Sequence, residues 1–156
     1  MTRTSIDILC PAPEATARLG EELGRRAQGG DLILLVGDLG AGKTTLTQGI
    51  ARALGYEGYV GSPSFVLVRE YHGRIPLYHI DFYRLEAPEE ISSLGLEEYL
   101  EGQGVCVIEW ADKALDLLPA EHLLVRMEHL SPSSRRVRLE GERCSIRTSR
   151  CSAGRR

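Results

Sequence analysis

No apolar stretch in the sequence approaches the roughly 18 residues that a membrane-spanning helix needs. Residues 1–7 do not form an apolar signal region. The four cysteines (Cys10, Cys106, Cys144 and Cys151) never stand in CxxC spacing, and no histidine lies near them in metal-ligand register. This argues against a disulfide framework and against a zinc site. We therefore expect a cytoplasmic protein that has no membrane partner.

Lysine is also scarce, because only Lys43 and Lys113 are found among the 19 basic residues. In a chain that otherwise uses arginine, a lysine suggests a position where a guanidinium would not serve. The 22 acidic residues give a net charge of −3, which argues against wholesale binding of nucleic acid. That value hides a split, since residues 135–156 carry +6 and residues 1–134 carry −9.

A chain of 156 residues is long enough for one domain and too short for a second full one. Hydrophobic residues at 42% and charged residues at 26% are typical of a soluble globular protein. We expect a folded domain over residues 1–141. Residues 142–156 are rich in Arg, Ser and Gly and are predicted to form a disordered tail.

Hydrophobic periodicity predicts an α/β fold with a mixed, mainly parallel central sheet between two helical layers. Residues 32–36 are apolar throughout, which is typical of a strand buried on both faces. The segment 72–74 separates two β-rich runs and predicts a hairpin. Strands are expected at residues 5–10, 32–36, 65–71, 75–82, 105–109, 123–127 and 137–139, and helices at 13–29, 42–54 and 96–100.

A phosphate-binding motif follows the apolar strand and opens a helix. Residues 37–44 read GDLGAGKT and match GxxxxGK[ST] in the strand–loop–helix setting that the motif requires. Glycines let backbone N–H groups turn toward phosphate oxygens, the lysine reaches the β- and γ-phosphates, and the hydroxyl binds Mg²⁺. The motif predicts a P-loop NTPase-like domain that binds ATP through Gly37, Leu39, Gly40, Ala41, Gly42, Lys43, Thr44 and Thr45.

Two predicted strands end in carboxylates, at Asp81 and at Glu109. Ligands of open α/β sheets bind outside the carboxyl ends of the strands, so both side chains can converge on the phosphate loop. With Thr44 they form the predicted Mg²⁺ site, and with Lys43 the predicted catalytic set. The alternative is that acidic residues merely end these strands, and beside a phosphate loop we favour the functional interpretation.

Three further side chains are candidates for function, each with a structural alternative. Ser64 lies in a loop where a hydroxyl can sense the γ-phosphate, or it belongs to an ordinary turn at Pro63. His79 shares a strand face with Asp81 and either orients it or is a structural histidine. Trp110, the single tryptophan, packs in the core or faces a partner.

Taken together, five segments resemble the bacterial TsaE (YjeE) family in order and spacing. They are GDLGAGKTT (37–45), SPSF (62–65), HIDFYR (79–84), GLEEY (95–99) and IEWA (108–111). The resemblance covers roughly residues 5–140. Its His-x-Asp-x-Tyr-Arg element (79–84) and its Glu-Trp element (109–110) are far more specific than the phosphate loop. The family usually has Thr where this chain has Ser64, which keeps the hydroxyl but fixes its rotamer less.

The resemblance implies an ATPase needed to make threonylcarbamoyladenosine at position 37 of tRNA. It implies docking on a TsaD-like and TsaB-like pair, contact with tRNA only through that complex, and hydrolysis of ATP that supports turnover without performing the transfer. It also implies that Asp81 and Glu109 are the acidic pair at the Mg²⁺ site, and that Trp110 is the family's adjacent tryptophan.

Two other functions remain alternatives. A small P-loop kinase would use the same phosphate loop, but such kinases usually carry paired arginines over the phosphates, and only Arg84 lies between Asp81 and Glu109. The second is a binding module in which ATP orders a docking surface and hydrolysis is incidental.

Overall fold

The computed structural model describes residues 4–38, 42–61, 68–83, 85–87, 89–90 and 95–141 of the chain. Within this part, one seven-stranded sheet carries helices on both faces. No helix in the described ranges is both long and apolar enough to cross a membrane. The Arg-rich segment predicted to be a tail lies outside the described residues.

The elements follow the predicted order, with one addition. They are β1 (Thr4–Cys10), α1 (Pro13–Arg26), β2 (Leu32–Gly37), α2 (Lys43–Ala53), β3 (Val68–Tyr71), β4 (Leu77–Asp81), α3 (Leu96–Leu100), β5 (Val105–Glu109), the 3-10 helix η2 (Ala111–Leu117), β6 (Leu123–His129) and β7 (Arg135–Gly141). Helix α1 ends three residues before the predicted Gly29, and η2 was not predicted. The first residues of the expected hairpin, 65–67, are outside the described ranges.

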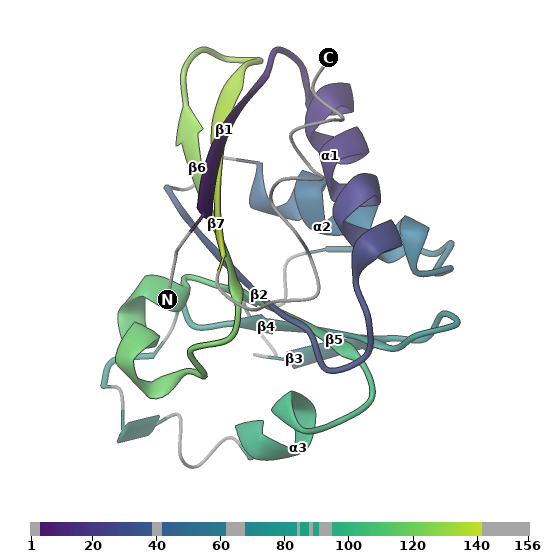
Figure 1. Cartoon of the computed structure of the whole chain (residues 1–156), viewed down its shortest axis with the longest axis vertical. Helices are drawn as coiled ribbons and strands as arrows, with labels where there is room; N and C mark the ends of the chain where they lie inside the picture. The colour runs from purple at the N-terminus through teal and green to yellow at the C-terminus, as the bar shows by residue number, and fades with distance from the viewer. Residues whose placement is uncertain are drawn as a thin grey trace.

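The strand order β1-β7-β6-β2-β5-β4-β3 confirms the α/β fold with a mixed sheet. The central strands β6, β2, β5 and β4 run parallel to one another, and the antiparallel pairs β1–β7, β6–β7 and β3–β4 lie toward the two edges. The sheet twists strongly, so that β1, β7 and β6 stand nearly upright in Figure 1 while β2, β5, β4 and β3 cross below them.

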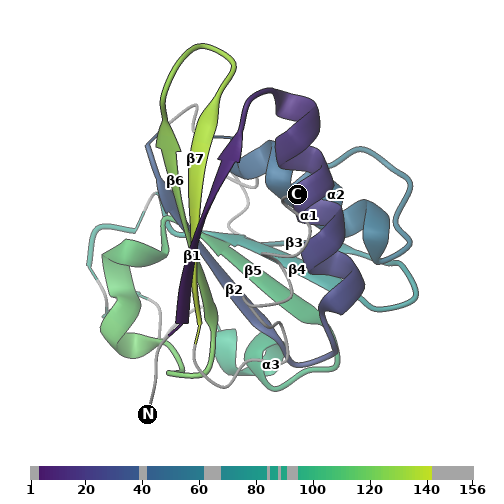
Figure 2. The same ribbon diagram turned by 45° about the horizontal axis from the view of Figure 1, so that its top comes forward.

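Two hydrophobic clusters fill the space on the two faces of the sheet. Helices α1 and α2 cover one face (Figures 1 and 2), where Leu23 and Ile50 pack on Ile33, Val107 and Val125. On the other face, η2 and α3 cover only the half formed by β2, β5 and β4. The outer strands β7 and β1 contribute no residue to this second cluster.

Close packing of α1 on α2 fixes the helix that follows the phosphate loop. A Cβ at Gly49 would lie 2.1 Å from the Ala17 carbonyl oxygen, and one at Gly20 would lie 2.2 Å from the Leu46 carbonyl oxygen. Only glycine permits this approach of the two backbones. Helix α2, which begins at Lys43, is therefore held tightly against the sheet.

Candidate active site

The predicted phosphate loop lies between β2 and α2. Residues 32–36 of β2 are buried, because the strand is central and covered on both faces. Gly42 directly precedes α2 with a φ of +99°, a conformation that strains any side chain. A Cβ there would also come within 3.4 Å of the Met127 side chain. The loop positions outside the described residues are Leu39, Gly40 and Ala41.

Lys43 is buried at the start of α2, and its side chain reaches back to Gly37 at the end of β2. Its ammonium donates a hydrogen bond to the Gly37 carbonyl oxygen at 2.5 Å and lies 3.8 Å from the centre of a Trp110 ring. Burial lowers the pKa of Lys43 below its usual value, and the negative charges of Glu109 and Asp81 oppose that shift. The ammonium thus lies within the electrostatic reach of both predicted acids.

The structure brings the two predicted acids together at one edge of the sheet. Asp81 ends β4 and Glu109 ends β5, and the two residues are direct partners in the parallel register of these strands. Both side chains are buried. Burial raises the pKa of Asp81, the hydrogen bond from the Tyr83 N–H opposes this, and the charge of Glu109 raises it further.

His79 contacts Glu109, whereas the sequence suggested Asp81 as its partner. Its Nε2 lies 2.5 Å from a Glu109 carboxylate oxygen, and its side chain is fully buried. Because Asp81 pairs with Glu109 across the strands, His79 stands one diagonal step away on the same face of the sheet. Among the described residues, no side chain or backbone group hydrogen-bonds its Nδ1.

Trp110 is neither a simple core residue nor freely exposed. It has a φ of +58°, unusual for a bulky side chain, and such backbone strain tends to cluster at functional sites. Its ring system contacts both the Lys43 ammonium and the ring of Tyr83, whose centre is 5.1 Å away. The indole therefore links the phosphate loop to the segment that follows Asp81.

The donor set at this edge fits a hard cation held together with phosphate oxygens. Thr44 and Thr45 lie half-buried in the first turn of α2, and Asp81 and Glu109 supply carboxylate oxygens. In the described part, no cluster of three His, Cys, Asp or Glu side chains could hold a metal by itself. Mg²⁺ at nucleotide sites uses one or two carboxylates with phosphates and water, so two acids and a hydroxyl suffice. Ser64 is outside the described residues.

Lys113, the second lysine, has a positioning contact that the sequence did not predict. Its ammonium donates to the carbonyl oxygens of Tyr83, at 2.5 Å, and Leu85, at 3.3 Å. A compact ammonium can serve two converging carbonyls, which explains a lysine in an arginine-rich chain. The contact ties the segment after Asp81 to η2, which follows Glu109 and Trp110.

Comparison with known proteins gives a consistent result. The family profile described as "Threonylcarbamoyl adenosine biosynthesis protein TsaE" matches residues 10–137. A protein of Bacillus subtilis named "tRNA threonylcarbamoyladenosine biosynthesis protein TsaE" is 44% identical over 80% of this chain and 78% of its own length. A protein of the same name from Nostoc is 44% identical over 85% of this chain and 84% of its own.

A solved structure is similar over nearly the whole chain. The crystal structure of Bacillus subtilis YdiB superposes with a TM-score of 0.84 at 33% identity and covers 99% of this chain and 98% of its own. The agreement extends through the sheet and both helical layers, and it confirms the predicted P-loop NTPase-like fold.

Proposed function

The chain belongs to the TsaE family of threonylcarbamoyl adenosine biosynthesis proteins, and from this membership we propose that it is a Mg²⁺-dependent ATPase of that pathway. The pathway modifies tRNA, as the names of the relatives state. We propose that the chain acts with a TsaD-like and a TsaB-like protein and meets tRNA through their complex. Its ATP hydrolysis would support turnover of the assembly.

One observation carries the ATPase proposal: a buried lysine and two buried carboxylates meet at the end of the strand that leads into the phosphate loop. Lys43 starts α2, while Asp81 and Glu109 end the two strands next in the sheet on one side of β2. A lysine in this position holds the β- and γ-phosphates, and carboxylates at neighbouring strand ends hold Mg²⁺ and orient the attacking water.

Each side chain then has a distinct task. Lys43 exchanges the Gly37 carbonyl for phosphate oxygens, and the backbone N–H groups at the start of α2 add their partial positive charge. Thr44 and Asp81 are proposed to hold the metal. A bound Mg²⁺ would supply positive charge against the negative charge that develops on the phosphate oxygens. Glu109, fixed by His79, accepts a hydrogen bond from the attacking water.

The two alternatives differ from this proposal in what they would produce. A small-molecule kinase would transfer phosphate to an acceptor without any partner protein. A nucleotide-gated binding module would need ATP to dock but would not depend on its hydrolysis. The absence of a paired-arginine segment between Asp81 and Glu109 in the sequence makes the kinase weaker.

The test measures nucleotide affinity and phosphate release for three variants, with and without the purified TsaD-like and TsaB-like proteins. Lys43→Ala should abolish productive ATP binding. Glu109→Ala should bind ATP but release phosphate at least tenfold more slowly, and Glu98→Ala, an exposed acid on α3, should match the wild type. A wild-type rate for Glu109→Ala would remove Glu109 from the site. A phosphorylated acceptor formed without partners would establish the kinase.

A further inference from the structure

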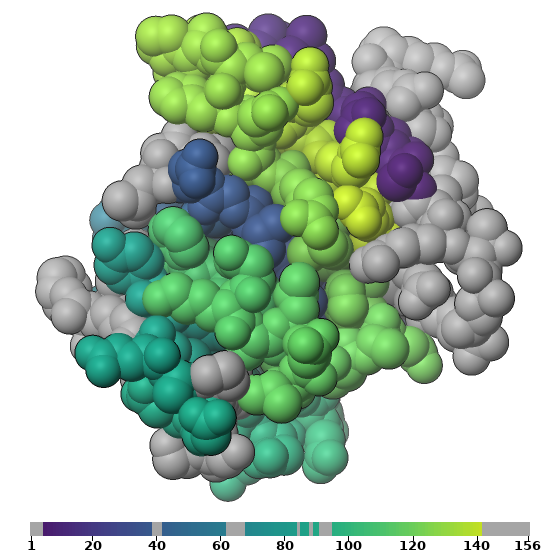
Figure 3. All heavy atoms as spheres, turned by 90° about the vertical axis from the view of Figure 1, so that its left-hand side faces the viewer, coloured from purple at the N-terminus to yellow at the C-terminus, as the bar shows by residue number. Residues whose placement is uncertain are grey.

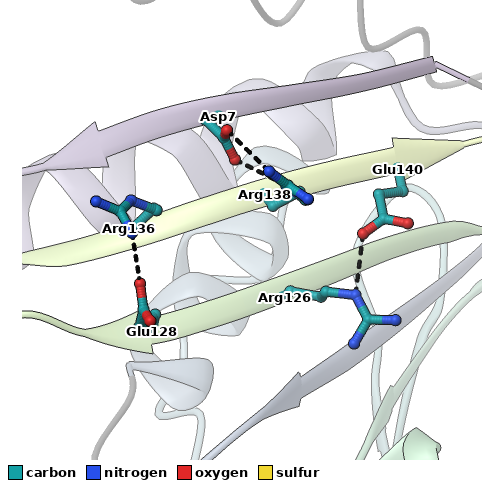
Figure 4. A network of polar contacts seen from close by, with 6 residues as sticks. All are labelled: Asp7, Arg126, Glu128, Arg136, Arg138 and Glu140. Carbon is teal, nitrogen blue, oxygen red and sulfur yellow. Dashed lines mark hydrogen bonds and ion pairs between the residues drawn. The ribbon is translucent and has the colours of Figure 1, made fainter.

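One half of the sheet is left open on the face opposite α1 and α2. On β6 the last residue buried on that face is Leu124, and beyond it the outward positions of β6 and β7 are charged, as is Asp7 on β1. These positions are occupied by Arg126, Glu128, Arg136, Arg138, Glu140 and Asp7, which Figure 4 shows side by side on the three strands. We call these six residues the open face.

The charges of the open face form three ion pairs. Arg138 donates hydrogen bonds to both carboxylate oxygens of Asp7 at 2.9 and 3.1 Å. Arg136 donates to Glu128 at 2.8 Å, and Arg126 donates to Glu140 at 2.9 Å (Figure 4). The three arginine side chains remain between 50% and 54% exposed. Exposed pairs of this kind contribute little to the stability of a fold.

The register of the open face combines two opposed pairs of opposite charge, Asp7 with Arg138 and Glu128 with Arg136, with one opposed pair of like charge. Arg126 and Arg138 stand directly opposite each other on β6 and β7, and like charges at opposed positions destabilise a sheet. Both guanidiniums already hold an acid of the chain, but each has five N–H donors and is about half exposed, so each can also donate to a carboxylate from outside the chain. Leu9, on the same face of β1 by strand alternation, is 63% exposed and offers an apolar contact beside them.

A hollow of about 540 Å³ joins the open face to the candidate active site. Its lining includes Gly37 and Asp38 at the entry to the phosphate loop, and Trp110 and Asp112 at the start of η2. Figure 3 looks onto this side, where the end of β2 (blue) lies between the β6–β7 strands (yellow-green) and η2 (green). A partner that covers the open face and fills the hollow therefore lies against Gly37 and Trp110, both of which contact Lys43.

Charge decides which class of macromolecule fits. The open face and the rim of the hollow together carry three arginines and five acids, the added acids being Asp38 and Asp112. Such a surface, with a net charge of −2, repels a nucleic-acid backbone. It complements a folded protein that presents one carboxylate to the central arginines and basic side chains around it.

We propose that the open face and its hollow are the surface on which the partner protein complex docks, a complex whose contact region is mainly basic with an acidic side chain at its centre. This inference rests on the proposed function, since it takes the TsaD-like and TsaB-like pair as that partner. Docking there places the partner against Trp110 and the phosphate loop, so the partner can sense whether nucleotide is bound.

The decisive variant exchanges the two residues of one ion pair, so that the pair itself is kept. In the double variant Asp7→Arg with Arg138→Asp, the ion pair and the net charge of the chain are kept, but the pattern that faces the partner is inverted. Its affinity for the purified TsaD-like and TsaB-like pair, measured with ATP present, should fall at least tenfold. Its ATP hydrolysis without partners should match the wild type, and its unfolding temperature should equal or exceed the wild-type value, because the exchange places an acid opposite Arg126.

A second variant tests the same surface in case the double variant does not fold. Arg136→Glu should also weaken binding at least tenfold, whereas Arg25→Glu makes the same charge change at a 59% exposed residue of α1, over the opposite face, and should not. Wild-type affinity in both open-face variants would overturn this inference alone. Failure of the wild-type chain to bind the pair would overturn the proposed function, and this inference with it. If the chain alone binds tRNA and the exchange abolishes that binding, the partner of the open face is a nucleic acid and not a protein.

Discussion

His79→Ala tests whether a buried histidine holds Glu109, the carboxylate on which the proposed ATP hydrolysis depends. In the structure, His79 Nε2 lies 2.5 Å from Glu109, and the two side chains are 0% and 5% exposed. No water can replace the imidazole without entering the core. The substitution therefore leaves a buried carboxylate without its partner, next to Asp81.

The size of the effect follows from burial. A buried polar group that loses its hydrogen-bond partner costs about 1–3 kcal/mol, so we expect the free energy of unfolding to fall by roughly that amount. Glu109 is then free to rotate away from the attacking water. Each 1.36 kcal/mol lost from transition-state stabilisation slows a reaction about tenfold, so kcat should fall about tenfold or more. KM should change little, because Lys43 and the phosphate loop are untouched.

Urea unfolding and steady-state phosphate release measure both consequences. His79→Gln, which keeps a side-chain donor, should recover part of kcat, and His72→Ala, at a histidine whose side chain is 76% exposed, should match the wild type in both assays. A loss of stability with unchanged kcat would make His79 purely structural. Wild-type values for both quantities would refute the positioning argument.

Three further predictions concern other parts of the molecule. Gly49→Ala should lower the free energy of unfolding by about 1–3 kcal/mol in urea, although alanine favours helices, because the new Cβ would lie 2.1 Å from the Ala17 carbonyl oxygen; equal or higher stability would contradict the packing. Burial raises the pKa of Cys106 from 9.0 to about 12. In a variant whose other cysteines are serine, alkylation of the folded chain should therefore stay slow at about pH 9. The free energy of unfolding should decline as pH rises above 9, because only the unfolded chain ionises there. Binding of ATP should change the fluorescence of Trp110, because Lys43 must leave its ring, and Lys43→Ala should abolish that change.

The features that the sequence predicted are those that a short segment determines. The apolar run before Gly37 and the helical pattern after Lys43 are local, so the strand, loop and helix could be assigned from periodicity. Asp81 and Glu109 could be expected to meet, because each ends a strand and parallel strands end at a common edge.

Contacts between neighbouring strands needed the structure. Which strand lies next to β4, and in which register, is a property of the whole sheet, and it decides that His79 meets Glu109. Lys113 illustrates the same limit. Its rarity could be noted in the sequence, but its role depends on η2 turning back toward Tyr83, which the left-handed backbone of Trp110 makes possible.

The contacts of Lys43 explain how its ammonium can be held near the candidate phosphate site without being tied up in an ion pair. Among the described residues, no ion pair joins Lys43 to Asp81 or Glu109, although both charges act on it. A direct pair would have to be broken whenever phosphate arrived. A carbonyl oxygen and an indole face hold the ammonium more weakly, since a cation–π contact contributes about 0.5–2 kcal/mol. In the proposed function the polyphosphate of ATP would displace both contacts, so the lysine would be positioned in advance and still be available.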